Sequence, residues 1–284
     1  MKYSSFTLMI CSLLFTACCE HHHESKEAAE KKIDTVKTAG KQSAESAEGN
    51  HVKSEAAHAS TKVEQGYALP RFDDGMAQSP INILSASTEK ENAHEVNLNF
   101  KDQIYAVENL GHTIQLDFKE GSTISVDGKI YAFKQIHFHT PSEHLIDGIT
   151  FPMEMHVVNV SSDQKEATGP AYIVLALLFK MGRENKFIKE FLNEVPAEEN
   201  EKEDLKAGTV KLQDLFVGIP KKELVNYYHY KGSLTTPPFT ESVDWVIRKH
   251  IFEASPGQIT AIEKTEGDNA RHVQALHERK VASN

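Results

Sequence analysis

Cysteine is scarce in this sequence: its 284 residues include only three, Cys11, Cys18 and Cys19, all near the first residue. The chain from Glu20 onward therefore contains no thiol, which excludes an internal disulfide and any thiolate ligand there. A transition-metal site in that part of the chain must use histidine, aspartate or glutamate.

Positive charge is also in deficit, since 31 lysines and arginines face 41 aspartates and glutamates, for a formal net charge of −10. Nucleic-acid-binding proteins usually carry a basic face, so this balance argues against a nucleic-acid partner. A negative surface likewise does not draw a folded domain onto an anionic membrane.

Aromatic residues, leucine and methionine are missing between Glu20 and about Gly66, a stretch without Phe, Trp, Tyr, Leu or Met. Lys, Glu, Ala, Ser and His dominate it, and burial there cannot offset the entropy of folding. We therefore expect residues 20–66 to be a disordered charged tether. Its His21-His22-His23 run is able to scavenge metal, although a solvated spacer is the simpler interpretation.

Residues 1–19 have the pattern of an export signal, since Lys2 supplies a positive start, Phe6 to Phe15 is apolar, and small residues precede Cys18. The segment Leu14–Cys18 also resembles a bacterial lipobox, which implies cleavage before Cys18 and lipidation of its sulfur. Plain secretion is the alternative. We expect a periplasmic or cell-surface protein whose membrane contact is limited to that lipid.

Residues 67–284 are numerous enough to form one well-buried core, and strand signals dominate them. The segment Ile114–Phe118 alternates apolar and polar residues, which is the period of a half-buried strand. The segments Val126–Ile130 and Ile146–Ile149 contain the pairs Asp127-Gly128 and Asp147-Gly148, and each pair favours the tight turn of a hairpin.

The apolar run Ala171–Phe179 predicts a central strand that is buried on both faces. One helix is expected over Glu184–Val195, where the apolar side chains share one face: Phe187, Ile188, Phe191, Leu192 and Val195. Many strands and few helices predict an α+β fold, mainly β. We expect a single domain around one large, twisted, mostly antiparallel sheet with a few short peripheral helices.

The segment around His137 and His139 is the richest in chemistry. Residues i and i+2 of a strand point to the same side, so these two imidazoles would project together, with Phe138 on the opposite face. The Asp147-Gly148 turn folds the chain back and can bring His156 beside them. Three histidines leave one tetrahedral position of zinc open for water, which is the arrangement of a catalytic site.

Two alternating histidines can also be hydrogen-bonded core residues, and an isolated His-x-His favours that interpretation. Gln135 lies two residues before His137 and Glu154 two before His156, so each points to the same side as its histidine. Such groups accept the free ring N–H and fix the tautomer of a ligating histidine. Their presence moves the interpretation toward a catalytic zinc site.

A later segment, Tyr230–Pro238, contains glycine and paired prolines and by itself predicts only a turn. Together with the other motifs, however, it strongly resembles the α-class carbonic anhydrases. The motifs that carry the resemblance stand in the family's order: Gln78–Ile83, Asn109–His112, His137-x-His139, Glu154–His156, Gly232–Pro238 and Asn269–Arg271.

The resemblance implies a zinc enzyme that reversibly hydrates carbon dioxide to bicarbonate and a proton, by attack of zinc-bound hydroxide. It makes His137, His139 and His156 the zinc ligands, and Gln135 and Glu154 the acceptors behind two of them. Carbon dioxide and bicarbonate are the implied partners. The sequence leaves monomer and dimer both open.

Further roles follow from the same resemblance. Thr235 would accept a hydrogen bond from the zinc-bound hydroxide and donate its own proton to Glu143, with Thr236 flanking the same space. His112 would be the proton shuttle, since the usual histidine pKa near 6.5 suits exchange with buffer. The apolar carbon dioxide pocket would be lined by Val158, Val174, Leu234, Val243 and Trp245.

The sequence departs from the family in three places. The aromatic segment that family members carry before the Gln-Ser-Pro motif is missing, and Trp245 is the only tryptophan of the chain. Thr140 replaces a frequent tryptophan beside the second zinc ligand. Phe239 stands where exported bacterial members often carry a disulfide cysteine. These differences bear on stability and on the rim of the site more than on zinc chemistry.

Two other functions compete with this interpretation. His137, His139, Glu143 and His156 imitate the three-His, one-Glu site of a cupin, in which Glu143 would bind iron or manganese for oxygenation or isomerisation. Alternatively, the chain is a non-catalytic binding or adhesion domain on the anhydrase scaffold, although such relatives typically lose zinc histidines that this chain keeps.

Overall fold

The computed structural model describes residues 75–284 except 93, 95, 100, 102–103 and 162–171. These residues belong to one compact unit, which spans Lys62–Asn284. The expected export signal, the lipidated Cys18 and the tether lie outside the described residues and stay predictions. Within the described part, no helix has the length and apolar character needed to cross a membrane.

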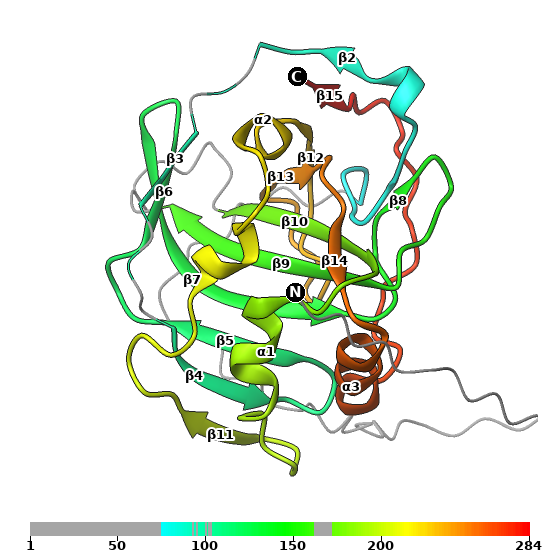
Figure 1. The fold of residues 1–284 in the computed structure, drawn as a ribbon. Helices are drawn as coiled ribbons and strands as arrows, with labels where there is room; N and C mark the ends of the chain where they lie inside the picture. Colours follow the sequence, from blue (N-terminus) through cyan, green and yellow to red (C-terminus); the bar gives the residue numbers. More distant parts are fainter. Residues whose placement is uncertain (1–74, 93, 95, 100, 102–103, 162–171) are drawn as a thin grey trace, which may run out of the picture. The chain divides into compact units, whose positions relative to one another are not determined.

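One large sheet dominates the described residues (Figure 1). Its strands follow the spatial order β11 (Glu201–Asp204), β4 (Ile104–Asn109), β5 (Ile114–Phe118), β7 (Lys129–His139), β9 (Met153–Ser161), β10 (Tyr172–Met181), β13 (Val243–Arg248), β12 (Tyr227–Gly232), β15 (Ala282–Ser283) and β2 (Glu89–Lys90).

Four shorter pairings complete the β-structure. Strand β14 (Phe252–Ala254) pairs with β10, and β6 (Thr123–Val126) pairs with both β7 and β3 (Val96–Asn99). A separate two-stranded sheet joins β1 (Asn82–Ile83) to β8 (Leu145–Ile146).

The expected single large, mainly antiparallel sheet is confirmed, with one difference at its centre. Strand β10 runs antiparallel to β9 but parallel to β13 and β14, and β15 is parallel to β2, so the sheet is mixed. The parallel pairing was not predicted, because it depends on a long crossover between β10 and β13 that local sequence patterns do not reveal.

Both predicted turns form where the Asp-Gly pairs stand. Asp127 and Gly128 adopt positive φ values of 49° and 81° between β6 and β7, and Asp147 and Gly148 adopt 52° and 78° after β8. Glycine tolerates this region without a Cβ clash, and aspartate is one of the few other residues that does so. The Asp147 carboxylate also accepts hydrogen bonds from Ser85.

The two faces of the central strands belong to two different cores, because alternate residues of a strand point in opposite directions. On β10, Ile173, Leu175 and Leu177 join one apolar cluster. Val174 and Ala176 join the other. The prediction of a strand buried on both faces is therefore confirmed.

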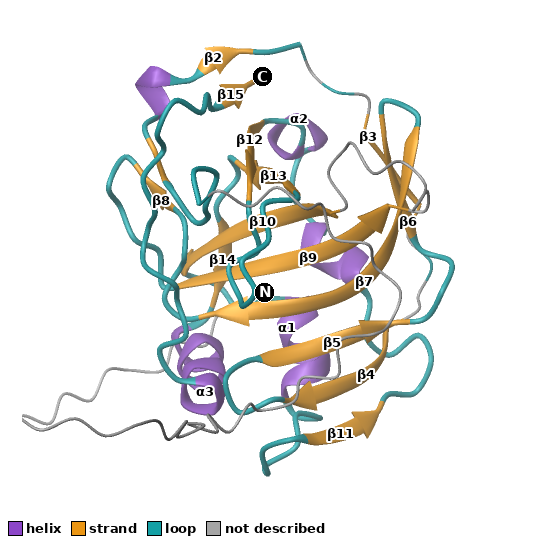
Figure 2. Ribbon diagram, turned by 180° about the vertical axis from the view of Figure 1, so that it is seen from behind, coloured by secondary structure: helices purple, strands orange, loops and turns teal. Residues whose placement is uncertain are grey.

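Helix α1 (Lys186–Leu192) covers the first of these cores, in front of the strands in Figure 1 and behind them in Figure 2. The Asn185 side chain caps its first turn, and Phe187, Ile188 and Phe191 are buried. The helix is shorter than the predicted Glu184–Val195, although Val195 still packs against the same core.

The remaining helical elements are the short helix α2 (Lys221–Leu224), the 3-10 turns Ser85–Ser87 and Leu212–Phe216, and helix α3 (Pro256–Glu266). Helix α3 was not predicted, yet its start signal is present in the sequence. Ser255 and Gln258 form a reciprocal capping box, and Pro256 occupies the first turn.

Gly232 at the end of β12 is expected to be indispensable for packing. A Cβ atom there would lie 2.1 Å from Ser79 Oγ and 3.0 Å from the Trp245 ring. We expect Gly232→Ala to lower the free energy of unfolding by about 1–3 kcal/mol, as overpacking does. Gly257→Ala is the control, because a Cβ atom there would meet only Ser255 Oγ, at 4.0 Å, among the described residues. Urea unfolding of both full-length variants measures the difference, and equal stabilities would contradict the packing argument.

Candidate metal centre

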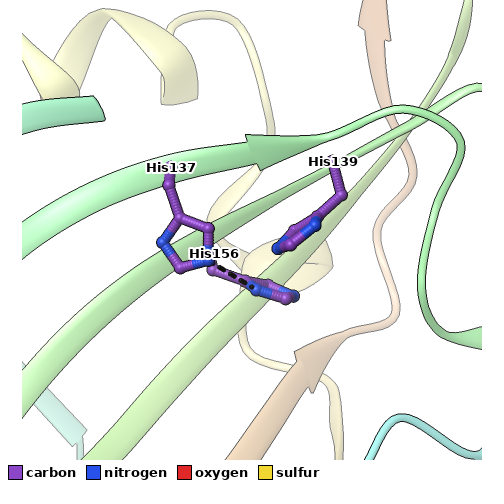
Figure 3. A group of neighbouring side chains, drawn as sticks. All are labelled: His137, His139 and His156. Atoms are coloured by element: carbon purple, nitrogen blue, oxygen red, sulfur yellow. Dashed lines mark hydrogen bonds between the residues drawn. The ribbon is translucent and has the colours of Figure 1, made fainter. Parts of the chain in front are cut away.

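The register of β7 and β9 brings the three predicted histidines together. These strands pair antiparallel with His137 opposite His156 and His139 opposite Glu154. Figure 3 shows the three imidazoles pointing toward one another, two from one strand and one from its neighbour. One nitrogen of each ring lies within 4.8 Å of the others.

The facing nitrogens fit a metal better than they fit one another. His156 Nδ1 lies 3.2 Å from His137 Nε2, and neither ring nitrogen of buried His139 has a hydrogen-bond partner among the described residues. A buried polar atom without a partner carries a substantial free-energy cost. A cation that accepts all three lone pairs removes that cost, so the donor set fits zinc.

Burial keeps these imidazoles neutral at physiological pH. It lowers the pKa of His137 well below its ordinary value, with help from its histidine neighbours, and lowers the pKa of His139 to about 4. The pKa of His156 is also lowered by burial, although Glu154 opposes the shift. Neutral rings present the lone pairs that a metal needs.

The two predicted acceptors lie behind the cluster. Gln135 Oε1 is 2.9 Å from His137 Nδ1, and Glu154 Oε1 is 2.7 Å from His156 Nε2. With these nitrogens occupied, His137 turns Nε2 and His156 turns Nδ1 toward the centre. The arrangement is the one by which outer groups orient ligating histidines.

A buried polar chain that the sequence reasoning missed continues from Glu154. Glu154 Oε1 also lies 2.6 Å from His144 Nδ1, and His144 Nε2 lies 2.8 Å from the Tyr230 hydroxyl, which donates to Ser79 Oγ at 2.8 Å. Burial alone would raise the pKa of Glu154, but His144 and His156 outweigh it and hold that pKa well below its usual value. The sequence feature that could have pointed to this chain of contacts is His144, a second polar residue directly after Glu143.

Glu143 lies beside the cluster, aimed at it. Its Oε1 accepts a hydrogen bond from the Arg271 backbone N–H at 3.0 Å. Within the described part of the chain Oε2 accepts none, and it stands 3.6 Å from His139 Nε2. Burial raises the pKa of Glu143. The Thr235 hydroxyl is close enough to favour the charged carboxylate. The structure therefore brings both members of the expected relay to the site.

His112 lies at the exposed edge of the same site. It stands in the turn between β4 and β5, and its Nδ1 is 2.9 Å from the Leu110 carbonyl oxygen. Asn269 holds the turn by donating to the carbonyl oxygens of His112 and Phe138, at 2.8 and 3.0 Å. The His112 ring is near enough to His137 to contribute to the lowering of that pKa.

The expected pocket residues share one apolar cluster next to the histidines. The buried members of that cluster include Val158, Val174, Val243 and Trp245, and Leu234 packs against it. The Trp245 ring centroid is 4.8 Å from that of His156. Thr236 is exposed.

Thr140 and Phe239, two residues that differ from the family pattern, make contacts of their own. Buried Thr140 donates to Glu266 Oε1 at 3.0 Å and to the Gly267 carbonyl oxygen at 2.9 Å. Glu266 Oε2 accepts from the Ile114 N–H at 3.3 Å, so this pair ties the end of α3 to β7 and β5. The Arg271 guanidinium lies 3.9 Å above the Phe239 ring.

Comparisons with known proteins agree with this geometry. Residues 66–284 match the family model described as eukaryotic-type carbonic anhydrase. The chain is 39% identical over 214 residues to a carbonic anhydrase of Neisseria gonorrhoeae, over 73% of this chain and 77% of that one. It matches the solved α-carbonic anhydrase of Thermovibrio ammonificans, in complex with the inhibitor sulfanilamide, at 36% identity and a TM-score of 0.66, over 73% of this chain and 87% of that one.

A relative with a different kind of name also matches. Dioscorin DB3L of Dioscorea polystachya is 31% identical over 217 residues, which is 73% of this chain and 75% of that one. The scaffold is therefore shared by proteins that do not all carry the name of the enzyme.

Glu266 is expected to make stability pH-dependent. Burial raises its pKa from 4.5 to about 8, so between these values the unfolded chain has lost a proton that the folded chain keeps. Stability then falls as pH rises through this window, by up to about 1.4 kcal/mol per pH unit. Glu266→Gln keeps an acceptor for Thr140 without the charge and should flatten that slope in urea unfolding between pH 5 and 8. Glu263→Gln, an exposed position of the same helix, is the control, and identical slopes in all three proteins would refute the assignment.

Proposed function

The chain belongs to the eukaryotic-type carbonic anhydrase family and is an enzyme of that kind, and we propose that its three histidines hold a zinc ion for the reversible hydration of carbon dioxide. The observation that carries the proposal is the convergence of three neutral imidazoles, two of them buried and one half-buried, whose ligand nitrogens lie within 4.8 Å of one another. The cupin interpretation is wrong, because the family match covers residues 66–284.

The zinc would be held by His137, His139 and His156, a set of three nitrogen donors without cysteine. Zinc bound there supplies a water whose pKa is lowered to about 7, an effect of which carbonic anhydrase is itself the standard example. Gln135 and Glu154 fix the ring orientations from behind, through contacts of 2.9 and 2.7 Å.

Thr235 and Glu143 orient the attacking water. A charged Glu143 accepts only, so the Thr235 hydroxyl must donate to it and can then only accept from the site. The site consequently favours a bound group that can donate a proton to Thr235. Hydroxide carries such a proton. This selection also disfavours anions that carry no proton.

The apolar wall formed by Val158, Val174, Val243 and Trp245 suits carbon dioxide, which has no net dipole. The wall lies in the same buried cluster against which Leu234 packs. Water gains no hydrogen bonds from such a surface, so the apolar substrate meets less competition there.

His112 is placed to carry the proton to solvent. It is exposed, whereas the nearby His139 and His156 are buried. An imidazole with one face toward water exchanges protons with buffer and is the residue most suited to that task near neutral pH.

Removal and return of zinc tests the proposed function. Carbon dioxide hydration by the full chain, followed as a stopped-flow pH change, should disappear after chelation and return when zinc is restored. His139→Ala should fail to retain zinc and should not be rescued. A folded chain that holds zinc without raising the hydration rate would support the non-catalytic binding alternative instead.

His112→Ala is expected to leave zinc content unchanged and to slow turnover in dilute buffer by about ten-fold or more, since general acid–base groups contribute 10²–10⁴-fold. Added imidazole should restore the rate by accepting the proton directly. The control is His277→Asn, because His277 is exposed and has a φ of 52°, a conformation that asparagine tolerates. If the dependence on buffer concentration matches that of the parent, His112 is not the shuttle.

A further inference from the structure

A second cluster of metal-ligating side chains lies away from the three-histidine centre. It consists of Glu91, His94 and His229, whose ligand atoms all lie within 4.8 Å of one another. His229 belongs to β12, Glu91 follows β2, and His94 precedes β3. None of these residues has a part in the proposed hydration reaction.

Backbone contacts hold the three segments in place. Strand β15 pairs with both β12 and β2, with Ala282 opposite His229 on one side and Glu89 on the other. The Glu91 N–H donates to the Ser283 carbonyl oxygen at 2.9 Å. The His94 N–H donates to the Tyr227 hydroxyl at 2.8 Å. The sheet therefore fixes the backbone positions of Glu91 and His229, and the Tyr227 hydroxyl holds the backbone of His94.

Glu91 stands between the two imidazoles. Its Oε1 lies 3.0 Å from His94 Nε2, and its Oε2 lies 3.3 Å from His229 Nδ1. The two rings meet edge to face with centroids 5.3 Å apart. One nitrogen from each ring thus lies beside a shared carboxylate, and the three residues together offer the donor types of a two-His, one-carboxylate metal site.

The outer nitrogen of each ring faces a carboxylate of its own. His94 Nδ1 lies 2.5 Å from Asp127 Oδ2, and His229 Nε2 lies 3.5 Å from Asp244 Oδ1. Ligating histidines usually have such a partner behind them, which fixes the tautomer and raises the basicity of the ligand nitrogen. His94 meets that condition through its hydrogen bond to Asp127, and the Asp244 carboxylate lies on the outer side of the His229 ring.

The local charge favours a cation. Three carboxylates surround two imidazoles, so the group stays negative even when both rings are protonated. The side chains of His94, Glu91 and His229 are 26%, 27% and 19% exposed, so a metal ion can reach the site from solvent.

We propose that Glu91, His94 and His229 bind a second divalent transition-metal ion, of the borderline class to which zinc belongs. Two imidazoles and one carboxylate suit such ions, whereas calcium and magnesium prefer oxygen donors throughout. Asp127 and Asp244 are positioning residues that act through the two histidines. The site is independent of the catalytic zinc.

Zinc titration of the zinc-loaded full chain tests this assignment. His21, His22 and His23 are changed to serine in every protein compared, so that this run does not contribute. Equilibrium dialysis with metal analysis should find one zinc per chain beyond the catalytic ion, and that zinc should be lost in both His94→Asn and His229→Asn. Asp127→Asn and Asp244→Asn should weaken its affinity about 10–100-fold.

His250→Asn is the matched control. The His250 side chain is also 19% exposed and pairs with one carboxylate, Glu223, at 3.2 Å, but the described residues place it in no group of three ligands. This variant should keep the additional zinc. Carbon dioxide hydration should be unchanged in all of these variants, which separates a failure of this site from a failure of the catalytic one.

Two results would overturn the proposal. One is a parent chain that binds no zinc beyond the catalytic ion at concentrations that saturate the controls. The other is an additional zinc that persists in both His94→Asn and His229→Asn. Circular dichroism of each variant establishes that it is folded, and the use of two separate histidines keeps the result decisive if one of them destabilises the chain.

Discussion

The pairing of β7 with β9 is the constraint on which the rest of the molecule depends. A slip of one residue would turn every side chain of a strand to the opposite face. Strand β9 is buried along its whole length, and β10 fixes it from the other side, so no alternative register keeps both cores apolar. A bulge before Gln135 completes the arrangement, because Phe133 pairs with Asn159 and Gln135 with Val158. Residues of β7 before the bulge and after it consequently change face, which turns His137 and His139 away from the helix-covered core.

Burial keeps the histidines of the centre neutral, and it also makes the ionisable groups beside them costly unless they have partners. Imidazoles excluded from water stay neutral and keep their lone pairs, but ionisable groups beside them need partners. Glu154 has two such partners, His144 and His156. The chain of contacts continues from His144 through Tyr230 to Ser79. Ser79 in turn accepts from the Ser233 N–H, two residues before Thr235. The Gln-Ser-Pro motif therefore supports the site through hydrogen bonds, although it is distant in sequence.

The two histidine clusters differ in a physically meaningful way. In the first, two of the three rings are buried and all three are neutral, which suits a metal that must keep a position open for chemistry. The second is partly exposed and surrounded by carboxylates, which suits a cation held by charge and by two oriented rings. The contacts that replace family features, Thr140 with Glu266 and Phe239 with Arg271, lie around the first cluster and leave its three ligands unchanged.

The sequence by itself determined the features that depend on interactions between residues close together in the chain. The alternation in Ile114–Phe118 and the two Asp-Gly turns depend on neighbouring residues, and both appear as predicted. The spacing of His137, His139 and His156, together with the family motifs, was sufficient to name the candidate ligands. Tertiary structure alone decided the parallel β10–β13 pairing, the bulge before Gln135, the buried path from Glu154 to Ser79, and the meeting of Glu91, His94 and His229. Each of these features joins residues that are far apart in the chain or shifts a strand register by one position. The hydrophobic periodicity of a single strand contains no information about either.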